Sequence, residues 1–171
     1  MDVRQLARLA LLTALVAVAT LVIRIPIPAT QGYINVGDAV IIAGALLGGG
    51  RMGGLAGGLG SALADLYGGY SHWAPFTLAI KGFEGWLVGW WAARLDLDLR
   101  RFAGLVVAGG ISLAGVTWMV AGYFLAELWL YSLGPALGSL LGNVVQAFAS
   151  LACGLPLAVA LQRSGVLGRQ A

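Results

Sequence analysis

The sequence predicts an all-α integral membrane protein with six transmembrane helices and both termini in the cytoplasm. Three observations lead to this fold class: an apolar composition, six apolar stretches, and a one-sided distribution of arginines. Of the 171 residues, 60% are hydrophobic and 10% are charged, whereas soluble domains average about 45–50% and about 25%. So few charges cannot cover the surface of a water-soluble protein. The composition therefore excludes a soluble domain, a disordered chain and a nucleic-acid-binding protein.

Six apolar stretches account for the spans, and we expect them to form a single transmembrane domain over residues 1–171. A spanning helix needs about 20 residues, so six helices fit within this length and seven would be crowded. The predicted spans are residues 6–23, 37–50, 51–68, 77–93, 103–129 and 136–161.

The first stretch leaves two interpretations open. It follows a basic start and could be a secretory signal peptide, with Ala17-Val18-Ala19 as a cleavage-like site. We favour an uncleaved span, because it is long enough to cross a membrane and leads into a long loop stiffened by Pro26 and Pro28. That loop is either part of an interfacial aromatic belt or a lid over an outward-facing pocket.

The later boundaries between predicted spans are marked by glycine, proline or charged residues. Gly48 to Gly50, followed by Arg51, predicts a tight turn between two helices, because an arginine in the middle of one long span would be costly. The remaining breaks are Gly68 to Pro75, Arg94 to Arg101, and Gly134-Pro135.

The basic residues set the predicted orientation. If both termini are cytoplasmic, only Arg24 lies in an outer loop, and Lys81 lies within a span. This is the bias expected of a membrane protein with positively charged cytoplasmic segments. The other eight basic residues fall on the cytoplasmic side: Arg4, Arg8, Arg51, Arg94, Arg100, Arg101, Arg163 and Arg169.

Seven polar side chains fall within the spans, all in the half predicted to be outer. An ionised side chain at the centre of a membrane costs about 2.5–3.5 kcal/mol on insertion scales, so such residues face the bundle interior and have partners. Because these side chains all lie in the outer half of the spans, the sequence predicts a pocket that opens to the outside and whose inner end is apolar. A proton relay or an ion path would instead need polar groups along the whole depth of the membrane. The seven residues are Asp38, Asp65, Lys81, Glu84, Glu127, Asn143 and Gln146.

Helical spacing groups these residues. Lys81 and Glu84 share a helix face at i,i+3, as do Asn143 and Gln146, and Tyr123 shares a face with Glu127 at i,i+4. The Lys81–Glu84 pair is either a structural ion pair or a ligand contact.

Other polar or aromatic residues have more local explanations. Trp118, nine residues before Glu127, falls on the opposite face of its helix. Asp38 follows Gly37 at a helix start and is expected to be an N-cap. We expect Asp65 to pair with Arg24 or to cap a loop. His72 stands alone and is expected to be an interfacial residue.

Small residues mark helix faces that can approach closely. Glycine recurs every four residues at Gly50, Gly54 and Gly58, a pattern that allows close helix packing in lipid. Ala10 and Ala14 form a similar patch on the first helix, where docking to another membrane protein is an alternative to packing within the chain.

Four passages together resemble the substrate-binding S component of an energy-coupling factor (ECF) vitamin transporter. They are residues 10–14 (ALLTA), 32–38 (GYINVGD), 57–65 (GGLGSALAD) and 72–82 (HWAPFTLAIKG). The sequence is most similar to the hydroxymethylpyrimidine or pyridoxine-type subgroup. The resemblance covers residues 5–93 well and the last two spans only in hydropathy.

The resemblance implies an S-component-like bundle in a bacterial or archaeal cell membrane, with a vitamin pocket beneath the first loop. It also implies docking through Ala10 and Ala14 to a transmembrane coupling subunit that carries two ATPase subunits. The chain itself has no P-loop motif, and we expect no cofactor, metal or catalytic residue. The residues expected to bind the substrate are Tyr33, Asn35, Lys81, Glu84, Trp118, Tyr123, Glu127, Asn143 and Gln146.

Two other classes of function remain as alternatives. A self-sufficient small transporter or channel predicts polar residues along the whole depth of the membrane, which the sequence lacks. An intramembrane enzyme would use Glu84, Glu127 or His72, but these residues belong to no recognised catalytic motif.

Overall fold

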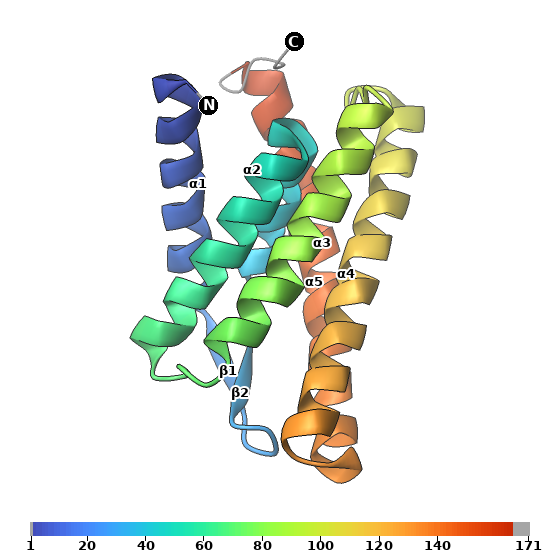
Figure 1. The fold of residues 1–171 in the computed structure, drawn as a ribbon. Coiled ribbons are helices and arrows are strands. Elements are labelled where there is room, and N and C mark those ends of the chain that lie inside the picture. Colours follow the sequence, from blue (N-terminus) through green and yellow to red (C-terminus); the bar gives the residue numbers. More distant parts are fainter. Residues whose placement is uncertain (1, 166–171) are drawn as a thin grey trace.

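The computed structural model describes residues 2–165, which form a bundle of long helices closed at one end by a β-hairpin (Figure 1). Arg169, expected on the cytoplasmic side, lies outside the described residues. The elements in chain order are α1 (Val3–Val22), β1 (Arg24–Ile27), β2 (Gly32–Asn35), α2 (Gly37–Gly68), α3 (Ala74–Arg94), α4 (Phe102–Leu130) and α5 (Leu133–Ser164).

Helix α1 begins at a capping box and lies at the edge of the bundle. The Asp2 side chain accepts a hydrogen bond from the Gln5 backbone N–H, and the Gln5 side chain accepts one from the Asp2 backbone N–H, which satisfies two otherwise free donors at the helix start. Its buried residues are Leu9, Val16 and Thr20. The other side of α1 remains exposed and apolar, as expected for a helix that faces lipid.

The loop after α1 is an antiparallel β-hairpin, an element that the sequence analysis treated only as a stiffened loop. Arg24 pairs with Asn35, and Pro26 pairs with Tyr33. Proline is tolerated here because a two-stranded sheet has only edge strands, where a missing N–H costs least. The hairpin lies at the same end of the bundle as the α2–α3 and α4–α5 connections, and β2 leads directly into α2 (Figure 1).

Helix α2 contains the predicted glycine turn. Gly49 has non-helical backbone angles, φ 80° and ψ 177°, in a region of backbone space that is open mainly to glycine. The chain reverses there, so residues 37–48 and 50–68 form two arms that run side by side in opposite directions (Figure 1). The structure thus divides residues 2–165 into five helices, and the second and third predicted spans are the two arms of α2. By length and composition, α1, α2, α4 and α5 are apolar enough to cross a membrane.

Glycines bring the second arm of α2 against α3. A Cβ atom placed on Gly85 would lie 2.2 Å from the backbone oxygen of Gly53, which leaves no room for a side chain. A Cβ atom on Gly82, three residues earlier on α3, would lie 3.5 Å from the Gly54 oxygen, an ordinary contact. The expected small-residue face of α2 therefore packs within the chain, with α3 as its partner.

This difference predicts opposite outcomes for the same substitution at two neighbouring positions. Gly85→Ala is expected to destabilise the bundle by roughly 1–3 kcal/mol, because the added methyl group forces two backbones apart. Gly82→Ala is the matched control and is expected to be neutral or slightly stabilising, since alanine favours helix by up to about 1 kcal/mol. Thermal unfolding of both variants in detergent measures the difference. Equal unfolding midpoints would contradict the close packing of α2 on α3.

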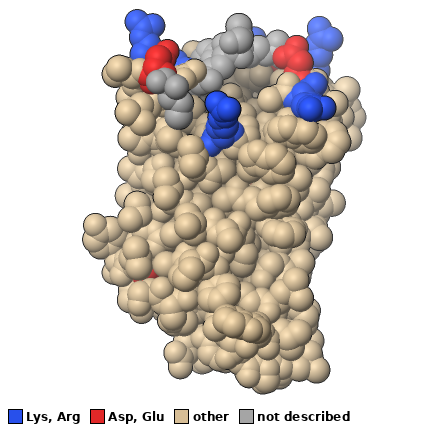
Figure 2. Space-filling view, viewed as in Figure 1, with Lys and Arg blue, Asp and Glu red and all other residues tan. Residues whose placement is uncertain are grey.

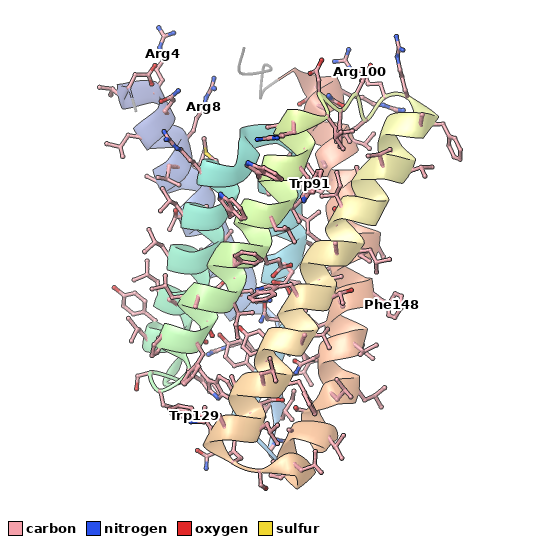
Figure 3. All side chains as sticks on the ribbon, turned by 45° about the vertical axis from the view of Figure 1, so that its right-hand side comes forward. Arg4, Arg8, Trp91, Arg100, Trp129 and Phe148 are labelled. Atoms are coloured by element: carbon pink, nitrogen blue, oxygen red, sulfur yellow. The ribbon has the colours of Figure 1, made fainter. Side chains whose placement is uncertain are left out.

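Exposed charge gathers at one end of the bundle. The start of α1 and the end of α5 both lie at this end (Figure 1), and the surface between it and the hairpin end is uncharged over almost all of the face that Figure 2 shows. Arg4, Arg8 and Arg100 extend from the charged end, Trp129 lies near the hairpin end, and Phe148 points outward from α5 (Figure 3). An apolar wall with charges at one end is the surface of a multi-pass membrane protein.

Candidate ligand-binding site

A cavity lies beneath the hairpin, where all five helices and both strands contribute residues. The empty space among its lining atoms, including its open mouth, is about 460 Å³. The lining residues are Thr20, Ile27, Gly32, Tyr33, Asn35, Ser61, Asp65, Trp73, Thr77, Lys81, Tyr123, Glu127, Asn143 and Gln146.

The structure brings most of the residues expected to bind the substrate to this one cavity. Glu84 does not line it; it lies three residues further along α3, fully buried and 3.6 Å from the Lys81 Nζ atom. The residues that do line it are Tyr33, Asn35, Lys81, Tyr123, Glu127, Asn143 and Gln146.

Trp118 lies outside the cavity, which corrects the expectation that it stacks on a ligand. Its side chain is 41% exposed. Its indole N–H donates to the backbone oxygen of Ile80 at 3.2 Å, and its ring lies 4.4 Å from that of Phe83. Helical spacing predicted that Trp118 lies on the face of its helix opposite Glu127. In the structure this face is turned toward the outside of the bundle.

A buried ion cluster joins α2, α3 and α5. Lys81 donates to Asp38 Oδ1, and the Gln146 amide donates to Asp38 Oδ2 at 2.6 Å. Because Lys81 also contacts Glu84, one ammonium group serves two carboxylates, and all three side chains are at most 1% exposed. The structure therefore contains the Lys81–Glu84 contact but gives Lys81 a closer partner in Asp38.

Asp38 is not the helix cap that its position suggested. The residue before α2 is Val36, which makes no side-chain cap, and the Gly37 N–H instead donates to Asn35 Oδ1 at 2.8 Å. Local capping preference favoured the wrong role, because the true partner of Asp38 is 43 positions away in the chain. The available sequence signal was an acid and a lysine at similar depth in two neighbouring spans.

Asp65 binds the hairpin through a tyrosine. The Tyr33 hydroxyl donates to Asp65 Oδ1 at 2.6 Å, and burial, followed by the nearby Asp65 charge, raises the pKa of Tyr33 above its usual value. Tyr33 is therefore a neutral donor. Arg24 does not pair with Asp65 as expected; it donates to the Gly68 backbone oxygen at 3.4 Å and lies over the Tyr33 ring. The backbone oxygen of Asp65 accepts from the Tyr70 N–H at the end of α2, a contact in which the carboxylate takes no part.

Helices α4 and α5 complete the wall. Ser139 donates to Glu127, and the Tyr123 hydroxyl donates to Thr77 at 3.1 Å, with the Lys81 ammonium 5.3 Å from the Tyr123 ring centre. These contacts orient an aromatic face and a carboxylate toward the same space. Asn143 and Gln146, which share a face of α5, both reach the cavity.

Sequence analysis missed Trp73 as a cavity residue. Its side chain is 3% exposed, and its ring packs on those of Phe76, Tyr123 and Tyr131. The sequence analysis gave an interfacial role to its neighbour His72 and none to Trp73. The available signal was its position directly before a helix that has proline in its first turn. His72, expected at the interface, is exposed and lies 3.2 Å from the Tyr131 hydroxyl.

Four lining residues of the cavity carry a buried polar atom that lacks a hydrogen-bond partner among residues 2–165: the donors Trp73 Nε1 and Asn143 Nδ2, the hydroxyl of Thr20, and the acceptor Asp65 Oδ2. Buried polar groups normally have partners, so a small molecule that offers both an acceptor and a donor would complete this site. Within the same residues, no group of histidine, cysteine or acidic side chains is placed to hold a metal ion.

Known proteins with similar sequences indicate the family of the chain. The chain is 30% identical over 167 residues to the thiamine precursor transporter HmpT of Lactococcus lactis subsp. cremoris (strain MG1363), covering 97% of this chain and 92% of that protein. It is 43% identical over 148 residues to a Pyrococcus woesei protein described only as an uncharacterized protein in gap 3'region, covering 86% of this chain and 95% of that protein. The family described as "ECF-type riboflavin transporter, S component" matches residues 1–163. The resemblance seen in the sequence is thus confirmed, and the chain belongs to the S components of ECF-type vitamin transporters, which are transport proteins and not enzymes.

Proposed function

We propose that this chain is the vitamin-binding subunit of an ECF-type importer in a bacterial or archaeal cell membrane, and that it binds a small heteroaromatic vitamin or precursor in the cavity beneath the hairpin. The observation that carries the proposal is the convergence of the hairpin and five helices on one polar cavity in a bundle whose outer wall is apolar. Hydroxymethylpyrimidine and pyridoxine are the favoured ligand types, because HmpT, by its name, carries a thiamine precursor.

We further propose that the protein forms one transmembrane domain that crosses the membrane six times, with both termini cytoplasmic. The two arms of α2 supply two crossings, and α3 supplies one although it carries Lys81 and Glu84. Those charges are compensated inside the bundle, so they do not meet lipid. The arginines at the charged end favour the cytoplasmic side for that end, so in this proposal the hairpin end faces the outside of the cell.

The partner in this proposal is a transmembrane coupling subunit with two ATPase subunits, docked on α1. Support comes from a shallow apolar groove between α1 and the second arm of α2, in which Ala10 and Ala14 are exposed. Residues with small side chains let another helix approach closely in lipid. The other lining residues of this docking groove are Leu6, Leu9, Thr13, Ala17, Leu59 and Leu63.

Two aromatic residues of α4 give a matched test of the cavity as the ligand site. Tyr123→Ala is expected to weaken binding at least about tenfold, because it removes an aromatic face within the cavity. Trp118→Ala is the control and should leave affinity unchanged, since Trp118 lies outside the cavity. Purified protein would first be examined by mass spectrometry for a co-purifying small molecule. It would then be titrated by calorimetry with hydroxymethylpyrimidine, pyridoxine, thiamine and riboflavin.

The outcomes separate the hypotheses. Absence of binding at micromolar or tighter affinity would overturn the assignment as a vitamin-binding subunit. Equal losses in the two variants would place the ligand elsewhere. Transport into liposomes by this chain alone, without ATPase subunits, would favour a self-sufficient transporter.

A further inference from the structure

Acidic side chains outnumber basic ones around the cavity. The one basic residue that lines it is Lys81 among the residues that the structure describes. Arg24 and His72 lie nearby but are exposed to solvent, Arg24 over the Tyr33 ring and His72 beside Tyr131. The carboxylates that line the cavity or contact Lys81 are Asp38, Asp65, Glu84 and Glu127, each at most 3% exposed.

The charge of Lys81 is already balanced within the protein. Its ammonium group contacts two carboxylates, those of Asp38 and Glu84. Asp65 and Glu127 lie on the other walls, and no cationic group within residues 2–165 comes within ion-pair distance of either. Their neighbouring polar groups are neutral, and they include the hydroxyls of Tyr33 and Ser139, which donate to Asp65 and Glu127 respectively.

A buried carboxylate without a counter-charge is unfavourable in a low-dielectric site, whereas an opposite charge placed beside it is favourable. From this imbalance we infer that the site selects heteroaromatic ligands that carry a positive charge and rejects their carboxylated or phosphorylated forms. The inference rests on the proposed function and specifies the charge class of its ligand.

One free polar atom of the cavity, the carboxylate oxygen Asp65 Oδ2, supports the same conclusion. Within residues 2–165, Asp65 Oδ2 has no hydrogen-bond partner, and the indole N–H of Trp73, which lines the same cavity, has none either. A protonated amine or ring nitrogen would bind the first atom, and a hydroxyl or unprotonated nitrogen on the same ring would accept from the second. Tyr123 adds an aromatic face, which also favours cations over anions.

Ligand series that vary one substituent on one ring test this selection. Hydroxymethyl, aminomethyl and carboxyl forms are compared on both the pyridoxine ring (pyridoxine, pyridoxamine and 4-pyridoxic acid) and the methyl-aminopyrimidine ring. The three forms have similar sizes, and the varied substituent is neutral in the hydroxymethyl form, positive in the aminomethyl form and negative in the carboxyl form. Calorimetry is expected to give an aminomethyl form that binds at least about 100-fold more tightly than the carboxyl form of the same ring, because like charges placed together cost several kcal/mol.

Variants identify the groups responsible. Asp65→Asn and Glu127→Gln, alone and together, are expected to reduce this ratio at least about tenfold in the double variant, while Asp98→Asn, a carboxylate in the loop between α3 and α4, should keep the parent ratio. The single variants keep the test valid if the double variant does not fold. Affinities of the two charged forms within threefold of each other, or a ratio unchanged in the variants, would overturn the inference. If no ring binds at all, the proposed function fails and the inference falls with it.

Discussion

Replacement of Lys81 by methionine is expected to lower the free energy of unfolding by about 3–5 kcal/mol, because removal of one partner of a buried ion pair leaves the other charge uncompensated. Here two carboxylates, Asp38 and Glu84, would lose the same counter-ion, and both side chains are 0% exposed. The remaining partner of Asp38 is the neutral amide of Gln146, which cannot balance a charge. Thermal unfolding in detergent, followed by the fluorescence of the six tryptophans, measures the loss.

Two controls show whether charge is the cause. Neutralisation of both acids in the Lys81→Met background, by Asp38→Asn and Glu84→Gln, should restore most of the lost stability, since no buried charge would remain. Arg101→Met removes the cation of a surface pair whose side chains are 83% and 35% exposed, and should change stability little. A triple variant as unstable as Lys81→Met would show that the lysine contributes through packing rather than charge.

Bulky residues on α1 are expected to abolish uptake without affecting ligand affinity. Ala10→Trp combined with Ala14→Trp would fill the docking groove on the outside of α1, where both alanines are exposed. Neither residue lines the cavity, so the purified variant should bind its ligand as the parent does. Uptake would be measured in cells that also express a coupling subunit and its ATPases.

Val106→Trp provides the matched control for this substitution. Val106 is 56% exposed near the charged end of α4, so it tests a bulky residue on a lipid-facing wall outside the groove. This variant should retain uptake. A loss of uptake equal to that of the alanine variant, or a parallel loss of ligand affinity, would count against docking through Ala10 and Ala14.

The apolar stretches predicted the helices, and helical spacing predicted which polar residues share one side of a helix. The spacings of Tyr123 with Glu127 and of Asn143 with Gln146 placed each pair correctly on one wall of the cavity. The turn at Gly49 followed from three glycines and the cost of an arginine within a long span. These features depend only on neighbouring residues and on the membrane as solvent, which is why the sequence alone predicts them.

Contacts between distant segments could not be predicted in this way. The hairpin pairs two short strands, one with a proline, which weakens the usual strand signal. Asp38 received a local role because its real partners come from α3 and α5. Periodicity reports the side of a helix on which a residue lies, but not which helix faces that side. The expected pocket role of Trp118 came from the family resemblance, whereas its helical spacing already placed it on the face opposite Glu127.

The amide of Gln146 ties the hairpin to the buried ion cluster. Its Oε1 accepts from the Asn35 backbone N–H at 2.7 Å, and its Nε2 donates to Asp38 at 2.6 Å. Both groups of one rigid plane are engaged, so the hairpin cannot swing away without breaking the first bond or pulling on the second. We therefore expect any movement of the hairpin away from the cavity to be slowed by the loss of these hydrogen bonds. Under the proposed function, the dwell time of a bound ligand is then expected to depend on the two hydrogen bonds of Gln146 as well as on equilibrium affinity. Gln146→Leu should shorten this dwell time.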